Sequence, residues 1–102
     1  MLMRAVHPGK VLKDELDELE ISPTEFARQI DVPANRISRI IAGKRAVTGD
    51  TALRFGHWFG TEPQFWLHLQ NAYEIRLAAE KAGEEIARLP VRAAAPDASS
   101  PA

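Results

Sequence analysis

The sequence predicts an all-α protein of five helices, and three observations lead to that fold class. Prolines stand where three of the helices would start, at Pro8, Pro23 and Pro63, positions that need no N–H donor. Glycines stand where two helices would end, and Gly43 suits a left-handed cap. Between these points apolar residues recur at intervals of three and four, the period of a helix that buries one face. The 102 residues, 45% of them hydrophobic, suffice for one domain with a modest core.

The composition excludes several classes of protein. The chain has no cysteine, which rules out disulfides, thiolate metal sites and a cysteine nucleophile. No stretch approaches the roughly 20 apolar residues of a membrane span, so no membrane association is expected. The segment from Met1 to Arg4 is too short and too broken for a signal peptide, and a cytoplasmic location is the resulting expectation.

The first helix is expected to start at Pro8, after an apolar arm of residues 1–7, and to run to about Leu19. One buried stripe is formed by Leu12, Leu16 and Leu19, which are four and three residues apart. The opposite face carries an acidic run, which consists of Asp14, Glu15, Asp17 and Glu18. This run is either a solvated helix surface or a docking surface for a basic protein partner.

The central segment, residues 24–43 (TEFARQIDVPANRISRIIAG), is predicted to form two short helices joined by a tight turn. Ser22-Pro23-Thr24-Glu25 is a capping box that starts the first of them. The buried residues of this helix are Phe26, Ala27 and Ile30. Asp31-Val32-Pro33 ends it, because the residue before a proline is driven away from helical angles.

The second helix of the pair starts near Pro33 and ends at Gly43. It turns Ile37 and Ile40 inward, and Val32 fills the turn before it. This pattern is that of a repressor-like helix-turn-helix, whose second helix lies in the major groove of DNA.

The fourth helix is expected to run from Thr48, its N-cap, to about Phe59. Its buried residues are Ala52, Phe55 and Phe59. Gly56 inside this helix costs about 1 kcal/mol relative to alanine, which indicates a close packing contact with the backbone. Gly60 ends the helix.

A long last helix is predicted to follow a second capping box, Thr61-Glu62-Pro63-Gln64. Its apolar row is Phe65, Leu69, Ala72, Ile75, Ala79, Ala82, Ile86 and Leu89, with Trp66, Tyr73 and Leu77 beside it. The row could simply cover the core of the first four helices, as its start does. Its outer half outruns that core, so we expect a homodimer contact there. The residues expected to form this contact are Trp66, Tyr73, Ile75, Leu77 and Ala79.

These predictions divide the chain into an arm at 1–7, a DNA-binding domain with a dimerisation helix at 8–89, and a tail at 90–102. The tail is rich in alanine, proline and serine and is expected to be flexible.

The net charge of −1 hides an asymmetry along the chain. Residues 28–54 contain six basic and two acidic residues, a net charge of +4, which leaves −5 for the remainder. A basic patch confined to the helix-turn-helix favours nucleic acid as the partner of that region. The alternative is that these charges belong to an ordinary solvated helix face.

With Ile37 and Ile40 in the core, one face of the second helix of the pair stays open. The residues predicted to read bases from this face are Ala34, Asn35, Ser38 and Arg39. Asparagine can pair with adenine and arginine with guanine, while alanine can touch a thymine methyl group. Arg39 is the best single candidate, and Asn35 could instead be an exposed polar residue without a role. Residues suited to the phosphate backbone surround the face: Thr24, Gln29, Arg36, Lys44, Arg45 and Thr48.

The segments HPGKVLKDEL and ISPTEFARQIDVPANRISRIIAGKRAVTGDTALRFGHWFGTEPQFWLHLQNAYEIRLA resemble the HigA family of antitoxins. The resemblance extends from about His7 to Leu89, and its most specific parts are GKRAVT, TALR and FWLHLQNAYEIR. It implies an all-helical dimer that binds double-stranded DNA at a palindromic operator and represses its own operon. It also implies that the protein neutralises a HigB toxin, a RelE-like ribonuclease that cuts messenger RNA on the ribosome.

Two residues depart from the pattern that the resemblance implies. Asp31 occupies a turn position where glycine is usual, which costs strain unless Asp31 bonds locally. Gly56 stands where many relatives have alanine. Because toxins of this kind are basic, the resemblance places the toxin contact on the acidic face of the first helix or on the arm.

An enzyme is not expected, and neither is a metal or a cofactor. His7, His57 and His68 share no metal-ligand spacing, and no phosphate-binding loop or paired-carboxylate site is present. Two alternatives remain beside the antitoxin: a transcriptional regulator of the same fold without a toxin partner, and a protein-interaction module that does not bind DNA.

Overall fold

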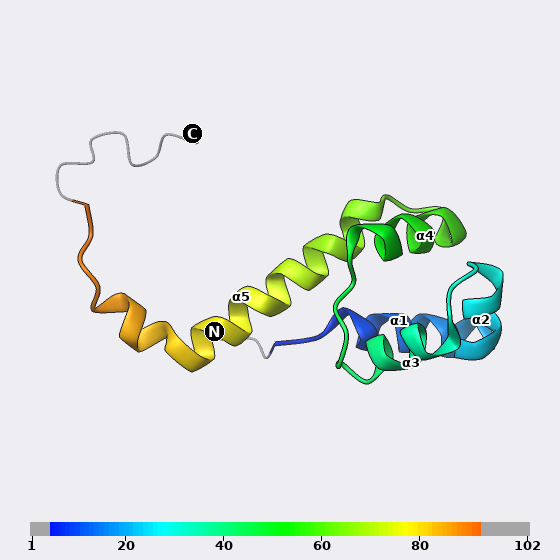
Figure 1. Cartoon of the computed structure of the whole chain (residues 1–102), viewed down its shortest axis with the longest axis horizontal. Helices are drawn as coiled ribbons and strands as arrows, with labels where there is room; N and C mark the ends of the chain where they lie inside the picture. The colour runs from blue at the N-terminus through cyan, green and yellow to red at the C-terminus, as the bar shows by residue number, and fades with distance from the viewer. Residues whose placement is uncertain (1–4, 93–102) are drawn as a thin grey trace.

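The computed structural model describes residues 5–92, which fold into five α-helices without a strand. The helices are α1 (Pro8–Leu19), α2 (Pro23–Gln29), α3 (Ala34–Ile41), α4 (Gly49–Phe59) and α5 (Pro63–Ala87). The first three helices pack together, α4 lies against the start of α5, and the rest of α5 projects away from this body (Figure 1). The predicted all-α fold with a long last helix is therefore confirmed, whereas the predicted tail lies almost entirely outside the described residues.

The first two helices begin at side-chain caps. The Nδ1 atom of His7 accepts a hydrogen bond of 2.9 Å from the backbone N–H of Gly9 at the start of α1. At the start of α2, the hydroxyl of Ser22 accepts from the N–H of Glu25 at 3.1 Å. Only this half of the predicted capping box forms, because the carboxylate of Glu25 accepts from Arg28 instead of turning back to Ser22.

The last two helices begin differently from the prediction. Thr48 is the N-cap of α4, but its hydroxyl donates to Thr51 at 3.4 Å and makes no cap bond to the backbone. Glu62, not Thr61, is the N-cap of α5, and no side-chain cap bond forms there. The second capping box was therefore wrong, and Pro63 alone sets this helix start.

Two glycines end helices as the sequence predicts. Gly43 has a φ of 76° and donates to the carbonyl of Ile40 at 2.9 Å, while the next residue, Lys44, donates to Arg39 at 2.8 Å. This pair of bonds is a Schellman motif, which satisfies the last carbonyls of α3. Gly60 has a φ of 75° and ends α4 in the same left-handed conformation.

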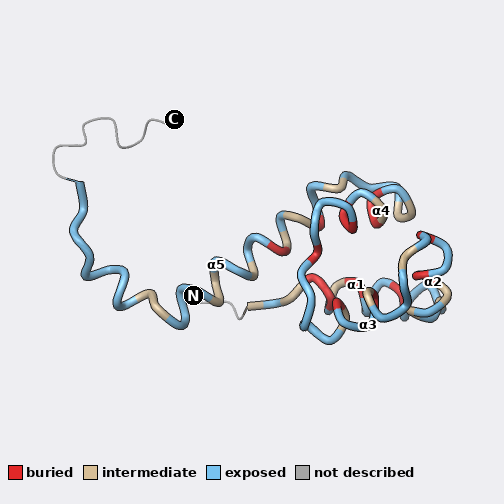
Figure 2. Tube along the Cα trace, viewed as in Figure 1, coloured by how far each residue is buried: buried red, intermediate tan, exposed pale blue. Residues whose placement is uncertain are grey.

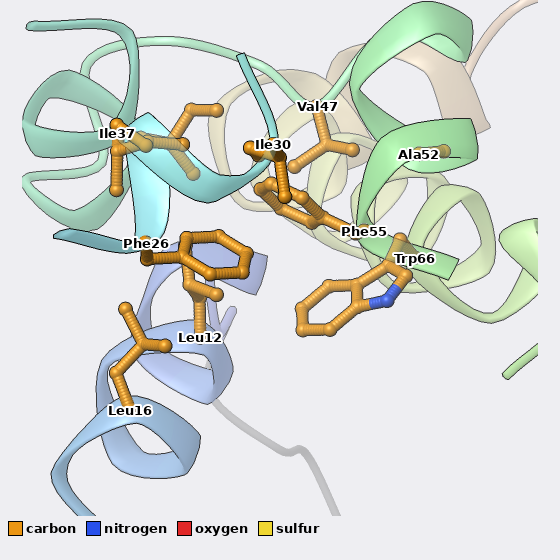
Figure 3. Close-up of a cluster of buried hydrophobic side chains, with 11 residues drawn as sticks. Leu12, Leu16, Phe26, Ile30, Ile37, Val47, Ala52, Phe55 and Trp66 are labelled. Atoms are coloured by element: carbon orange, nitrogen blue, oxygen red, sulfur yellow. The ribbon is translucent and has the colours of Figure 1, made fainter. Parts of the chain in front are cut away.

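The core contains side chains from all five helices, as Figure 3 shows. Phe55 lies at its centre, with ring centroids 5.5 Å from Phe26 and 5.0 Å from Trp66. The other buried apolar residues are Leu12, Leu16, Ala27, Ile30, Ile37, Ile40, Val47 and Ala52. Complete burial of a large apolar side chain contributes about 1.5–3 kcal/mol, so this cluster is the main source of stability.

Three residues lie on a different face from the one predicted. Leu19, expected in the buried stripe of α1, is 52% exposed, because α1 ends there beyond the edge of the core. On α5, Trp66 is only 2% exposed, whereas Phe65 is 45% exposed. The buried face at the start of α5 is thus displaced by one residue from the predicted one. Trp66 is too deeply buried to take part in the predicted dimer contact.

Close backbone contacts explain two glycines inside helices. A Cβ on Gly56 would lie 2.8 Å from the carbonyl oxygen of Thr61, which confirms the predicted close packing against α4. A Cβ on Gly9 would lie 1.8 Å from the carbonyl oxygen of Ile40, so α1 can cross the end of α3 only without a side chain there.

The outer half of α5 is exposed on nearly all sides (Figure 2). The helix has 25 residues and is therefore about 38 Å long. Beyond the body it presents Ile75 and Ile86, which are 71% and 55% exposed. Such a row of uncovered apolar side chains was expected for this part of the chain. Across residues 5–92, none of the helices combines the length and the apolar character needed to cross a membrane.

Candidate nucleic-acid interface

Helix α3 is held from behind by two residues and is open in front. Ile37 and Ile40 are completely buried. The residues of the opposite face are all exposed: Ala34, Asn35, Ser38 and Arg39. They form two neighbouring rows, since residues four apart lie one above the other on a helix. The hydroxyl of Ser38 donates to the backbone carbonyl of Asn35 at 3.2 Å, and its oxygen can still accept a hydrogen bond from a base.

The segment between α3 and α4 adds positive charge beside this face. Lys44 and Arg45 are exposed and follow Gly43 directly, while Val47 is buried and anchors the segment in the core. Thr48, the last residue before α4, is also exposed. Three of the predicted phosphate-contacting side chains are thus exposed in the segment that joins α3 to α4.

Arg36 is the exception among the basic residues. Its side chain is only 24% exposed, and its Nη1 atom lies 3.0 Å from the carboxylate of Asp50 on α4. The same carboxylate accepts from Arg54 at 2.9 Å. These two arginines lower the pKa of Asp50, mainly through the Arg54 hydrogen bond. Arg36 therefore joins α3 to α4, and its contact with a DNA phosphate stays a prediction.

On α2, the two side chains predicted to contact phosphate differ in how available they are for a hydrogen bond. Thr24 is exposed in the first turn. Gln29 already uses both ends of its amide, since its Oε1 accepts from Trp58 at 2.8 Å and its Nε2 donates to Glu25 at 2.8 Å. Hydrogen bonds from Arg28 and then from Gln29 lower the pKa of Glu25 to about 2. A phosphate contact of Gln29 would require this network to open.

Two residues that the sequence patterns did not single out support the interface from behind. Gln70 on α5 is only 5% exposed, and its Oε1 accepts from the backbone N–H of Val47 at 2.8 Å. The ring of His7 lies beside Gly43, where a Cβ would meet it at 3.9 Å, and edge-on to Tyr73, with ring centroids 4.9 Å apart. A signal was available in each case, because Gln70 interrupts an apolar stripe and His7 immediately precedes a helix-starting proline.

The predicted dimer contact is only partly free. Trp66 is in the core, and Tyr73 is half-buried against His7 of the same chain. Ile75 and Ala79 are exposed and Leu77 is half-buried. The surface that remains uncovered therefore lies on the outer part of α5, and its pairing with a second chain stays a prediction.

The acidic run of α1 is fully exposed but partly neutralised. Lys10 lies 3.4 Å from Asp14, and Lys13 lies 2.7 Å from Asp17, each pair one helical turn apart. The other two members of the run, Glu15 and Glu18, are exposed on the same helix. Surface pairs of this kind stabilise a helix only slightly. Within residues 5–92, no three carboxylate or imidazole groups converge in a way that could hold a metal ion.

A family model described as helix-turn-helix matches residues 12–66 of the chain. These residues extend from α1 into α5 and include the whole candidate interface. Among characterised sequences, virulence-associated protein I of Dichelobacter nodosus is 38% identical over 79 residues, which cover 76% of this chain and 73% of that protein.

Solved structures match over most of the described helices. An addiction module antidote protein of a HigA family from Coxiella burnetii is 43% identical, with a TM-score of 0.86 and coverage of 88% of this chain and 99% of that one. The Pseudomonas aeruginosa antitoxin HigA, solved with the higBA promoter, is 37% identical, with a TM-score of 0.82 and coverage of 85% and 97%.

Proposed function

The chain belongs to the HigA family of helix-turn-helix proteins, and on that premise we propose that it is an antitoxin whose helix α3 reads operator DNA. One observation carries the proposal. Four residues of α3 that suit base edges stand exposed in two rows, while two fully buried isoleucines hold the helix from behind. Insertion of α3 into the major groove would need no rearrangement of the core.

Each exposed residue of α3 has a chemical partner in the groove. Arg39 can donate two bonds to guanine, and Asn35 can pair with adenine. Ala34 can touch a thymine methyl group, and Ser38 can bond to several bases. A good bidentate contact contributes roughly 1–3 kcal/mol of discrimination against the wrong base. Lys44 and Arg45 would then contact phosphates, which set the register of the protein rather than the sequence that it reads.

A second copy of the chain would complete the operator-binding unit. One head makes few base contacts, whereas two heads about 34 Å apart read both halves of a palindrome. The outer part of α5 supplies an apolar surface for the pairing, with Ile75 and Ile86 uncovered. Pairing along a helix of this length would set the distance between the two heads.

The toxin partner proposed for this antitoxin is a basic, RelE-like HigB ribonuclease, which it would bind in the cytoplasm. The acidic face of α1 is the surface best suited to it, because opposite charges steer association and exclude wrong partners. Lys10 and Lys13 neutralise part of this face, so the contact is expected to centre on Glu15 and Glu18.

Binding of the protein to the region upstream of its own gene tests the DNA-reading proposal. Replacement of Arg39 by alanine should weaken specific binding at moderate salt by at least about 30-fold, the equivalent of one bidentate base contact in each of the two heads. Arg92→Ala is the matched control, because Arg92 is also exposed but follows the end of α5. Unchanged specific affinity in the Arg39 variant would remove α3 as the reading helix.

Co-expression tests the antitoxin proposal separately. A small basic open reading frame next to the gene should arrest growth when expressed alone, and this protein should restore growth. Glu15→Lys combined with Glu18→Lys should weaken the rescue, while binding to operator DNA stays as in the wild type. If no neighbouring gene product is toxic but DNA binding persists, the protein is a transcriptional regulator without a toxin partner.

A further inference from the structure

The basic segment between α3 and α4 is fastened to α5 by a buried amide. The side chain of Gln70 is almost completely enclosed, and its Oε1 accepts the N–H of Val47 at 2.8 Å. Its Nε2 donates to the carboxylate of Glu74, one turn further along α5, at 2.9 Å. Because both ends are engaged, the amide cannot rotate without breaking a bond. The position of Val47 is thereby tied to that of α5.

A second contact lies at the start of the same segment. The ring of His7 lies beside Gly43, where a Cβ would meet it at 3.9 Å, and packs edge-on against Tyr73 of α5. Both contacts reach the backbone of the segment rather than its charged ends. The side chains of Lys44 and Arg45 therefore remain exposed while the chain that carries them is held.

We propose that Gln70 is a positioning residue for DNA binding: it aligns the proposed phosphate-contacting segment 44–48 with α5, the helix whose outer half is proposed to pair with a second chain. This inference rests on the proposed DNA binding. The register of the segment and the spacing of the two heads are then set by one rigid helix. Loss of the Gln70 bond loosens the Val47 end of the segment without altering the base-reading face of α3, which is anchored separately by Ile37 and Ile40.

The test is a salt titration of binding to a duplex that carries the upstream region, with Gln70→Met as the variant. Methionine fills a similar volume but offers no strong acceptor for the Val47 N–H. The plot of log K against log salt has a negative slope, whose magnitude decreases by about 0.9 for every phosphate that the protein no longer neutralises. The slope should therefore fall by at least about 1.8 in a dimer whose two heads each release one phosphate. Discrimination against an operator with one altered base pair opposite Arg39 should stay within about twofold of the wild type.

Two controls isolate the acceptor bond. Glu74→Gln removes the charge at the other end of the same amide but keeps an acceptor for it, and should leave the slope unchanged. Addition of Gln70→Met to a Lys44→Ala, Arg45→Ala variant should reduce the slope no further, because the side chains through which it acts are already absent. A full wild-type slope in Gln70→Met, or a loss of base discrimination in proportion to affinity, would overturn the proposal.

Amide hydrogen exchange gives a readout that does not depend on an operator. The N–H of Val47 should exchange slowly in the wild type and much faster in Gln70→Met, while the amides of Ile37 and Ile40 keep their protection. Equal protection of Val47 in both proteins would overturn the role of Gln70. If Gln70→Met does not fold, Gln70→Asn, which is one methylene too short to reach Val47, replaces it. Absence of any specific DNA binding by the wild type would instead reject the proposed function.

Discussion

The guanidinium of Arg54 on α4 donates a hydrogen bond of 2.8 Å to the backbone carbonyl of Ile30, the C-cap residue of α2. A second bond from the same Nη1 atom reaches the carbonyl of Asp31 at 3.3 Å. The carbonyls at the end of a helix have no partner within it, and here a neighbouring helix supplies one. The turn that joins α2 to α3 is therefore held by α4.

Replacement of Arg54 by lysine should lower the free energy of unfolding by about 1 kcal/mol. The single ammonium group of lysine cannot reproduce a planar fork that bonds Ile30 and Asp50 at once. Urea denaturation measures the change, and Arg92→Lys, outside the helices, is the control. Equal denaturation midpoints for the Arg54 variant and the wild type would contradict this role.

Replacement of Asp31 by glycine should stabilise the protein by about 0.5–1 kcal/mol, because a residue with a Cβ pays a steric cost in the left-handed region. Asp31 has a φ of 60°. For a domain of this size the melting temperature should rise by a few degrees. Asp31→Ala keeps the Cβ and should give no such rise. Binding to DNA should stay as in the wild type, since Asp31 lies outside the predicted contact residues.

Two glycine-to-alanine changes should act in opposite directions. Gly56→Ala places a Cβ 2.8 Å from a backbone carbonyl and should cost about 1–3 kcal/mol, despite the better helix propensity of alanine. Gly83→Ala, in the outer part of α5, meets nothing closer than 3.9 Å and should stabilise the helix by up to about 1 kcal/mol. Thermal melts followed by circular dichroism distinguish the two. Stabilisation by both changes would show that the backbone of α4 can move away from Thr61.

The proposed dimer should dissociate when charge enters the outer part of α5. Ile75→Glu places a carboxylate in the apolar surface and should shift the mass measured by light scattering from two chains towards one. Leu53→Glu is the control, because Leu53 is similarly exposed but lies on α4. Operator affinity should fall together with the dimer, since one head then binds alone. A wild type with the mass of one chain at micromolar concentration would reject the dimer.

Stability should decrease as the pH falls below about 6.5, in part because of His7. Burial lowers the pKa of His7 below its ordinary value of 6.5. The backbone of Arg45 and the charge of Glu74 act in the opposite direction, with smaller effects. The unfolded chain then binds a proton in a pH range where the folded one does not, so the folded state loses stability as pH decreases. His7→Asn keeps a cap for α1 but cannot titrate. The urea denaturation midpoint of this variant should therefore change less between pH 7 and pH 5.5 than that of the wild type. An unchanged difference in the His7→Asn variant would contradict this role of His7.

Local patterns predicted most of the helices because the responsible interactions are short in range. The hydroxyl of Ser22 reaches an N–H three residues away, and Gly43 allows a left-handed conformation by itself. The open face of α3 also follows from spacing, once Ile37 and Ile40 are assigned to the core. Such rules failed at the starts of α4 and α5. The hydroxyl of Thr48 bonds to the side chain of Thr51 instead of capping α4, and Glu62 makes no side-chain cap bond at all.

The five helices, the buried stripe of the helix-turn-helix and the residues of α3 left for a partner could all be predicted from the order of the amino acids. The packed fold was needed to show that Trp66 rather than Phe65 enters the core, and that Gln70, His7 and Arg54 hold the segments around α3. The reason is distance along the chain. Gln70 and Val47 are 23 residues apart, and Arg54 and Ile30 are 24. Periodicity shows which face of one helix is apolar, but only the packed arrangement shows which distant backbone group a buried polar side chain meets.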